Sequence, residues 1–221
     1  MAAILFDLYG TLIDISTDED SPHFWNTFTR KVKYLHPAGP EYLREEYQKL
    51  CKDLELETEE IDILKVFQNM FQISKEESIR VAKIFRICST KYLRLYRGVK
   101  TLLKRLKKEG HHLYVLSNAQ EAFTPQEVKH LKLHSYFEGI ALSSKYGVKK
   151  PNPEFFIRAI KDFQTKEKLW MIGNDYDCDI VPAKKLGIQT IFIESNLTPS
   201  HPETDRLIGF NAKEIQRRIS A

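Results

Sequence analysis

The sequence predicts an α/β protein in which a doubly wound parallel sheet is interrupted by a helical module. The prediction rests on a change in the pattern of apolar residues along the chain. In residues 1–15 and 96–221, short apolar runs alternate with helical patterns, which is typical of a parallel sheet covered by helices on both faces. Residues 16–95 read as helical throughout. We therefore expect an α/β core built from the two outer segments and a helical insertion formed by residues 16–95.

A local pattern indicates each element of the expected core. Residues 99–108 and 180–186 form helical patterns, and a glycine follows each as a stop signal. Two further helices are expected to begin at Thr124 and Asn152, because each is a capping side chain followed by a proline, which the first turn of a helix tolerates. The candidate strands, all short apolar runs, are residues 4–9, 113–117, 139–143, 169–173 and 190–193.

The expected insertion is dominated by helical spacing. Ser74 begins a capping box that opens a helix. Phe24, Trp25 and Phe28 near its start are more typical of a packed helical core than of a ligand site, although His23 to Trp25 and Arg30 are candidate substrate contacts. The apolar stripes are Leu43, Tyr47, Leu50 and Leu54, then Ile61, Leu64 and Phe71, then Ile79, Ala82, Phe85 and Cys88.

Composition excludes several classes of protein. The chain has 221 residues and a mild net charge of +4, enough for a core domain with one smaller inserted domain. Its basic run, residues 104–108, lies on the solvated face of an amphipathic helix and has no interleaved aromatic residues, so we expect no nucleic-acid partner. No apolar run approaches membrane-spanning length. Three widely separated cysteines offer no disulfide framework, which favours a reducing, cytoplasmic location.

The first chemical feature is Asp7, which follows the first apolar run. This position places Asp7 at the carboxyl end of the first strand, where open parallel sheets bind ligands. Gly10 allows a sharp turn, and Thr11 offers a hydroxyl group nearby. An aspartate followed by a glycine is also common at strand ends, so this motif alone does not decide between structure and function.

Three further clusters follow the later strands. Ser117 and Asn118 end the second strand, Lys150 follows the third, and an acidic segment from Gly173 to Asp179 follows the fourth. Each cluster alone has an ordinary structural explanation. Because the carboxyl ends of parallel strands meet at one edge of a sheet, the acid, the hydroxyl, the lysine and the acidic segment are expected to converge on one crevice.

Together these motifs resemble the haloacid dehalogenase superfamily over nearly the whole chain. Its first motif matches residues 7–11, its second Ser117, its third Lys150, and its fourth residues 173–179. The resemblance implies a Rossmann-like core of residues 1–15 and 96–221 with an α-helical cap, residues 16–95, inserted after the first motif.

The resemblance also implies a role for each motif residue. Asp7 would attack the substrate to form a covalent intermediate that water later hydrolyses. Thr11 and Ser117 would donate hydrogen bonds to the transferred group, and Lys150 would neutralise charge on it. Asn118, next to Ser117, is also a candidate site residue. The expected oxygen ligands of a Mg²⁺ ion are Asp7, the backbone carbonyl of Tyr9, Asp179, and either Asn174 or Asp175, with Asp175 preferred.

Two positions depart from the pattern of the family's phosphatases. These enzymes carry an aspartate two residues after the nucleophile as general acid and base, where this chain has Tyr9. The fourth motif begins Gly173-Asn174-Asp175, where Gly-Asp is more usual, so the metal carboxylate is displaced by one position if Asp175 fills that role.

These departures leave three functions open. Tyr9 favours a dehalogenase, because the family's dehalogenases have tyrosine there and a departing halide needs no proton. The acidic fourth motif, Asp175, Asp177 and Asp179, favours a Mg²⁺-dependent phosphatase acting on a small phosphate ester, because clustered carboxylates require a cation. A binding protein with weak or lost catalysis is the third alternative. We favour the phosphatase.

Overall fold

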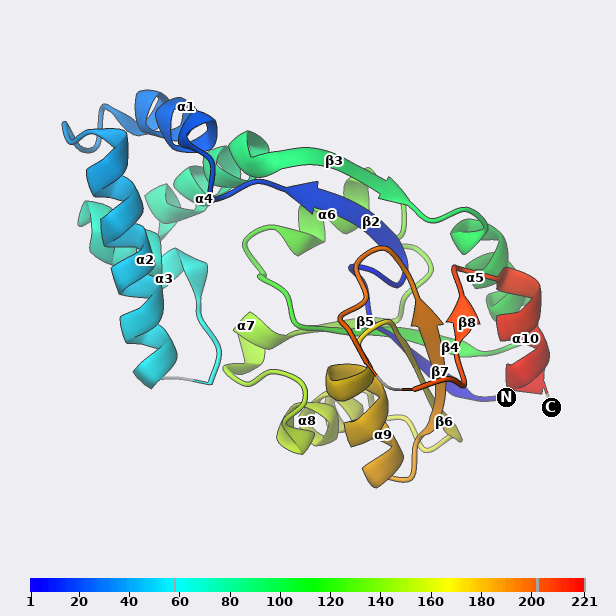
Figure 1. The fold of residues 1–221 in the computed structure, drawn as a ribbon. Helices are drawn as coiled ribbons and strands as arrows, with labels where there is room; N and C mark the ends of the chain where they lie inside the picture. The colour runs from blue at the N-terminus through cyan, green and yellow to red at the C-terminus, as the bar shows by residue number, and fades with distance from the viewer. Residues whose placement is uncertain (58, 202, 221) are drawn as a thin grey trace.

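A six-stranded sheet lies at the centre of the computed structural model, which describes residues 1–57, 59–201 and 203–220. Neighbouring strands all pair in parallel, in the order β5-β4-β1-β6-β7-β8 (Figure 1). The five expected strands are confirmed, and the two-residue strand β8 is too short to leave a sequence pattern. The strands are β1 (Ala3–Phe6), β4 (His112–Ser117), β5 (Gly139–Leu142), β6 (Leu169–Gly173), β7 (Gln189–Glu194) and β8 (Leu207–Ile208).

The first strand is shorter than predicted. It ends at Phe6, whereas the sequence suggested continuation to Tyr9. The chain then makes a tight turn, in which the amides of Leu12 and Ile13 both donate to the Leu8 carbonyl, at 2.8 and 2.9 Å. Asp7 therefore stands where the strand leaves the sheet, although its amide still donates to Ile172 on β6 at 2.9 Å.

Helices cover both faces of the sheet. The expected helix of residues 99–108 is confirmed, as is the Asn152 cap, whose side-chain oxygen accepts from the Glu154 amide at 2.9 Å. Thr124 does not cap its helix as predicted, because its hydroxyl pairs with Tyr9 instead. The expected helix of residues 180–186 is the second part of a longer helical segment that begins as a π-helix. These elements are α5 (Val99–Lys108), α6 (Thr124–His130), α7 (Ser143–Tyr146), α8 (Pro153–Phe163), the π-helix (Tyr176–Ile180), α9 (Val181–Lys185) and α10 (Ala212–Ser220).

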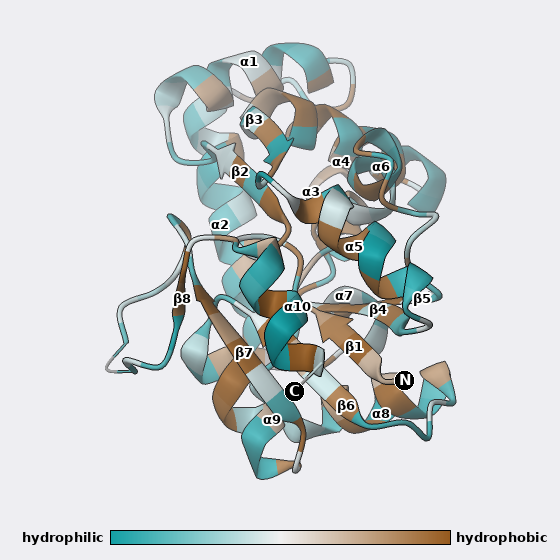
Figure 2. Ribbon diagram, turned by 90° about the vertical axis from the view of Figure 1, so that its right-hand side faces the viewer, coloured by the Kyte–Doolittle hydropathy of each residue, from teal (hydrophilic) through white to brown (hydrophobic). Residues whose placement is uncertain are grey.

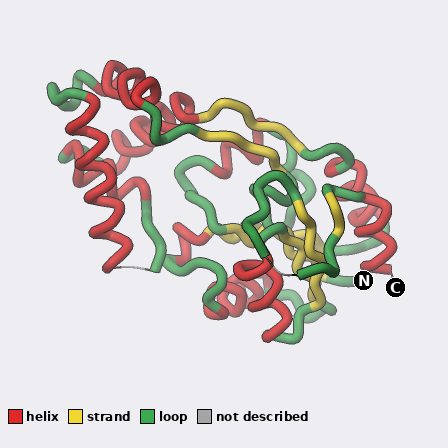
Figure 3. The backbone as a smooth tube through the Cα atoms, in the orientation of Figure 1, coloured by secondary structure: helices red, strands yellow, loops and turns green. Residues whose placement is uncertain are grey.

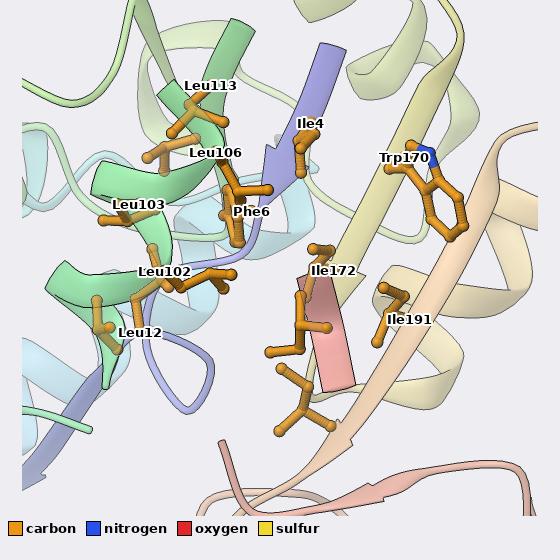
Figure 4. Packing of buried hydrophobic residues seen from close by; sticks show 14 of the residues in the cluster. Ile4, Phe6, Leu12, Leu102, Leu103, Leu106, Leu113, Trp170, Ile172 and Ile191 are labelled. Carbon is orange, nitrogen blue, oxygen red and sulfur yellow. The ribbon is translucent and has the colours of Figure 1, made fainter. Parts of the chain in front are cut away.

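Alternate residues of the central strands enter two separate apolar clusters. Ile4 and Phe6 of β1 pack with α5 and α10 on one face (Figure 4), whereas Leu5 packs against α8 and α9 on the other. This two-sided burial explains why the strands read as continuous apolar runs. Figure 2 shows hydrophobic strands in the middle and hydrophilic stretches on the outer helices. In the described parts of the chain, no helix is both long and apolar enough to cross a membrane.

Four helices form a second body with its own apolar centre. They are α1 (Pro22–Val32), α2 (Pro40–Glu57), α3 (Ile63–Phe71) and α4 (Lys75–Ser89), and they lie together at the left of Figure 3. Phe24, Trp25 and Phe28 are buried among them, so these aromatic residues are core rather than substrate contacts. Ser74 caps α4 as expected, accepting from the Glu77 amide at 3.2 Å.

An antiparallel ribbon joins the four helices to the sheet. It pairs β2 (Ile13–Thr17) with β3 (Thr90–Leu95) and arches between the two bodies in Figure 1. The prediction that residues 16–95 are helical throughout is therefore wrong at both ends. In β3, Leu93 and Leu95 alternate with polar residues and pack on the core of the sheet. This two-residue period is hard to see in the sequence, because it directly follows the helical period of α4. The division into a core of residues 1–15 and 96–221 and a cap of residues 16–95 stays a prediction.

Candidate active site

Asp7 is the centre of a buried hydrogen-bond network at the carboxyl ends of the strands. Its Oδ1 atom accepts from Lys150 Nζ at 2.8 Å and from Ser117 Oγ at 3.0 Å. Its Oδ2 atom accepts from Thr11 Oγ1 at 3.1 Å. The sequence-predicted residues Asp7, Thr11, Ser117 and Lys150 are thus in direct contact, and all four are buried.

The Lys150 ammonium group binds two carboxylates. Besides Asp7, it donates to Asp179 Oδ1 at 2.6 Å and to the Leu116 carbonyl at 2.9 Å. Although burial alone would lower the pKa of Lys150, the charges of Asp179 and Asp7 raise it above its ordinary value. Burial raises the pKa of Asp179, an effect that the charge of Lys150 opposes. Two carboxyl groups thus share one ammonium group, and burial disfavours the charged form of Asp179.

Asn118 holds the Lys150 backbone. Its side-chain nitrogen donates to the Lys150 carbonyl at 2.8 Å, and its side-chain oxygen accepts from the Lys150 amide at 2.8 Å. This pair of bonds ties the loop after α7 to the end of β4. The observed contacts of Asn118 therefore position Lys150, while its exposed side chain also forms part of the cavity wall.

Two glycines allow this close packing. Gly10 has a positive φ of 87°, and a Cβ atom there would lie 2.2 Å from the Asn174 side-chain nitrogen. A Cβ atom at Gly173 would lie 2.1 Å from Asp179 Oδ2. Any larger residue at either position would push Asn174 or Asp179 out of the cluster.

The fourth motif brings Asn174, rather than Asp175, to Asp7. One terminal atom of the buried Asn174 amide lies 3.2 Å from Asp7 Oδ2, 3.0 Å from the Tyr9 carbonyl oxygen and 3.1 Å from Thr11 Oγ1. The Asp175 carboxylate caps the π-helix instead, accepting from the Cys178 amide at 2.9 Å. In residues 1–57, 59–201 and 203–220, no three acidic, histidine or cysteine side chains are grouped to hold a metal. Of the expected metal ligands, Asp7, the Tyr9 carbonyl and Asn174 thus lie together, whereas Asp179 binds Lys150 and Asp175 caps the π-helix.

The Tyr9 side chain points toward the helical body. Its hydroxyl donates to Glu127 of α6 and lies 3.1 Å from Thr124 Oγ1. Glu127 in turn accepts from Arg86 of α4 at 2.6 Å. Burial, reinforced by the charge of Glu127, raises the pKa of Tyr9, so the phenol stays protonated. Tyr9 therefore links the first motif to a buried ion pair between the core and the helical body.

A cavity of about 170 Å³ opens over Asp7. Its wall includes Tyr9, Asn118, Asn174 and Asp175, and also Leu197 and Pro199 from the loop after β7. No sequence signal pointed to these last two residues, because nothing in a loop of that composition indicates its position. Asp177 is exposed and does not line the cavity.

A sequence model of the haloacid dehalogenase-like hydrolases matches residues 4–193. The chain belongs to this family. A 2-haloacid dehalogenase from Pseudomonas syringae has the same fold, with a TM-score of 0.67, 20% identity, and coverage of 100% of this chain and 98% of that one. The haloacid dehalogenase-type phosphatase from Thermococcus onnurineus aligns with a TM-score of 0.65 and 19% identity over 99% and 98% of the two chains. At these identities the likeness concerns the fold.

Among relatives of known activity, two similarities stand out. A glyceraldehyde 3-phosphate phosphatase from Pyrococcus furiosus is 35% identical over 104 residues, which is 47% of this chain and 43% of that protein. The match thus spans less than half of that archaeal relative. A phosphoglycolate phosphatase from Aquifex aeolicus is 29% identical over 192 residues, covering 86% of this chain and 83% of that protein.

Glu127 and Arg86 are the contacts of this haloacid dehalogenase-like hydrolase that sequence reasoning missed. Glu127 lies between Thr124 and Val128, both buried, so it places a charge on the apolar face of a helix. A charged residue on an otherwise apolar helix face is the sequence signal that points to Glu127. Its partner could not be found in the same way, because Arg86 lies 41 positions earlier in the chain.

We expect the Arg86–Glu127 pair to stabilise the fold. Arg86→Met leaves a largely buried carboxylate unpaired and should cost about 2–5 kcal/mol of unfolding free energy. Arg86→Met combined with Glu127→Gln should cost less, because the new amide carries no charge and would still accept from Tyr9. Urea unfolding measures both. The control is Arg80→Met on the same helix, whose exposed pair with Glu77 should contribute within about 1 kcal/mol. Equal costs for Arg86→Met and Arg80→Met would contradict the assignment.

Proposed function

We propose that this chain is a Mg²⁺-dependent phosphatase that hydrolyses a small phosphate monoester through a covalent phosphoryl intermediate on Asp7. The observation that carries the proposal is the meeting of three oxygen-bearing groups, Asp7 Oδ2, the Tyr9 carbonyl and the Asn174 amide, separated by 3.0 and 3.2 Å. The phosphatase relatives support it as well. A dehalogenase remains the second candidate, because Tyr9 stands where phosphatases of the family carry an acid.

The three groups fit a magnesium ion when the Asn174 amide turns its oxygen toward Asp7 and Tyr9. Carboxylate, carbonyl and amide oxygens are the hard ligands that would hold Mg²⁺. With its nitrogen turned toward Asp7 and Tyr9, the Asn174 amide donates to both; with its oxygen turned toward them, it needs a cation between them. When bound, Mg²⁺ supplies positive charge that draws the phosphate to the nucleophile and offsets the charge that develops on it.

The residues of the chain then divide the chemistry. An Asp7 carboxylate oxygen forms a bond to phosphorus while the bond from phosphorus to the leaving oxygen breaks, and that oxygen departs with its electron pair and takes up a proton. Water then attacks phosphorus, which frees Asp7 and releases phosphate. Lys150 and Ser117, which donate to Asp7 here, are placed to donate to the phosphoryl oxygens as well. Asp179 holds Lys150 in position.

We further propose a cytoplasmic location. All three cysteines, Cys51, Cys88 and Cys178, are free thiols, which suits a reducing compartment. The proposed partner is a small-molecule phosphate ester rather than a nucleic acid or a membrane.

Asp7→Asn should abolish turnover while the protein stays folded. An amide is nearly isosteric with the carboxylate but is a far weaker nucleophile. Steady-state hydrolysis of p-nitrophenyl phosphate, measured beside a circular dichroism melt, checks both points. Retention of more than a small fraction of the wild-type kcat would remove Asp7 as the nucleophile.

Activity should require Mg²⁺ and disappear in a chelator. Asn174→Asp adds a charged ligand at the proposed site and should lower the half-saturating Mg²⁺ concentration by about tenfold, because ligand charge sets the affinity for hard cations. Asn174→Ala should raise that concentration. Asp175→Asn, the matched control, should change it little.

Mg²⁺ titrations of p-nitrophenyl phosphate hydrolysis measure all three variants. A larger effect of Asp175→Asn than of Asn174→Ala would move the ligand to Asp175. Full hydrolysis of p-nitrophenyl phosphate in chelator would contradict the Mg²⁺ requirement, and turnover of a 2-haloacid in place of the ester would move the protein to the dehalogenase branch.

Because Tyr9 replaces the usual acid, leaving groups that need no protonation should be preferred. The hydroxyl of Tyr9 is engaged by Glu127, so alkyl phosphates should react slowly and aryl phosphates faster. Tyr9→Asp should raise kcat on alkyl phosphates more than on aryl phosphates, since general acid catalysis contributes about 10²–10⁴-fold. Tyr9→Phe, the control, should leave the alkyl-to-aryl ratio of kcat unchanged. An equal change for both ester classes in Tyr9→Asp would show that no acid is missing at this position.

A further inference from the structure

A second cavity, of about 390 Å³, lies beyond Tyr9 between the core and the helical body. Tyr9 and Asn118 line both this cavity and the smaller one over Asp7, so the two spaces meet at these residues. The second cavity is therefore adjacent to a phosphate group held at Asp7. The chemistry of this wall bears on which esters fit, provided that the proposed phosphatase function is correct.

The charged groups of the second cavity are mainly carboxylates. Glu19, which follows β2, and Glu60, which precedes α3, both line it. Of the described residues in its wall, Arg86 is the only cation, and its charge is already matched by Glu127 at 2.6 Å. The cavity therefore offers no unmatched positive group to a ligand.

Burial disfavours the charged form of both carboxylates. Burial raises the pKa of Glu19 despite the nearby charge of Arg86, and burial also raises the pKa of Glu60 despite the charge of Lys149 outside the wall. Glu60 also accepts from the Gln120 amide at 3.3 Å, a neutral donor. A ligand that brings hydrogen-bond donors or positive charge would relieve this cost, whereas a ligand carboxylate would increase it.

The rest of the wall is largely aromatic and aliphatic. Tyr47 and Phe85, whose ring centroids lie 5.1 Å apart, come from α2 and α4, and Phe123 comes from the loop before α6. Aromatic rings beside carboxylates suit apolar or cationic groups, since a ring face attracts a cation and an apolar surface alike.

We propose that this second cavity receives the leaving group of the phosphate ester and selects esters whose leaving group is uncharged or cationic over esters that carry a carboxylate. The carboxylates of Glu19 and Glu60 repel an anionic leaving group, and the rings of Tyr47, Phe85 and Phe123 contact the others.

The test compares alkyl phosphates that differ in charge but share the same kind of leaving oxygen. Glycerol 3-phosphate is neutral beyond its phosphate, phosphocholine is cationic, and phosphoglycolate and 3-phosphoglycerate are carboxylated. We expect kcat/KM for glycerol 3-phosphate and phosphocholine to exceed that for the carboxylated pair by at least about tenfold. p-Nitrophenyl phosphate is measured alongside as a general reporter of phosphatase activity.

The outcomes separate the two proposals. Hydrolysis of p-nitrophenyl phosphate together with equal or better use of phosphoglycolate and 3-phosphoglycerate would overturn the selectivity and leave the phosphatase function standing. Absence of p-nitrophenyl phosphate hydrolysis in the presence of Mg²⁺ would overturn the phosphatase function and this inference with it.

Variants assign the selectivity to the cavity. Glu19→Gln and Glu60→Gln should each narrow the preference for glycerol 3-phosphate over 3-phosphoglycerate by about tenfold, because each removes one repelling charge. The control is Glu41→Gln, an exposed position of α2 outside the cavity wall, which should leave the preference unchanged. An unchanged preference in both cavity variants, with thermal melts that match the wild type, would overturn the assignment.

Discussion

The site depends on the Lys150 ammonium group, which lies out of contact with water between Asp7 and Asp179. A buried ammonium is tolerated only with charged partners and satisfied hydrogen bonds, and here two carboxylates and the Leu116 carbonyl fill that role. These groups come from the ends of β1 and β4, from the π-helix that follows β6 and from the loop after α7. One interaction therefore gathers the carboxyl ends of neighbouring strands, and removing its cation would leave two buried carboxylates unpaired.

The same cluster explains why the fourth motif can accept an asparagine. Lys150 contacts Asp7 through Oδ1, whereas Oδ2 accepts from the Thr11 hydroxyl, a neutral donor. In the proposed function a divalent cation lies beside Asp7 Oδ2 and is held by Asp7, the Tyr9 carbonyl and Asn174. A neutral amide in place of a carboxylate lowers the affinity of this site for the cation without removing an oxygen ligand. In the proposed function, the metal would therefore bind more weakly than it would to an aspartate at position 174.

The sequence predicted those features that follow from strand order and failed where tertiary contacts decide. The convergence of Asp7, Ser117, Lys150 and Asp179 was predictable, because parallel strands end at one edge of the sheet. The choice between Asn174 and Asp175 was not, because the two residues are adjacent in the sequence. Only the fold shows that the Asp175 carboxylate caps the π-helix while the Asn174 amide contacts Asp7.

Contacts between the two bodies were equally hidden. The sequence alone suggests that Tyr9 faces the reaction, yet its hydroxyl is engaged by Glu127, which is 118 positions away and is held in turn by Arg86. The ribbon strand β3 was missed because a two-residue period over six residues is masked by the long helix before it.

The central claim is that Asp7 becomes covalently phosphorylated during turnover. Rapid mixing of the protein with p-nitrophenyl phosphate and Mg²⁺, followed by borohydride reduction and peptide mass spectrometry, tests it directly, because borohydride reduces an acyl phosphate to an alcohol. We expect that Asp7 is converted to homoserine only when substrate and Mg²⁺ are both present, and that Asp175 and Asp179 are unmodified. Reduction at either of those residues, or turnover with no modified Asp7, would contradict it.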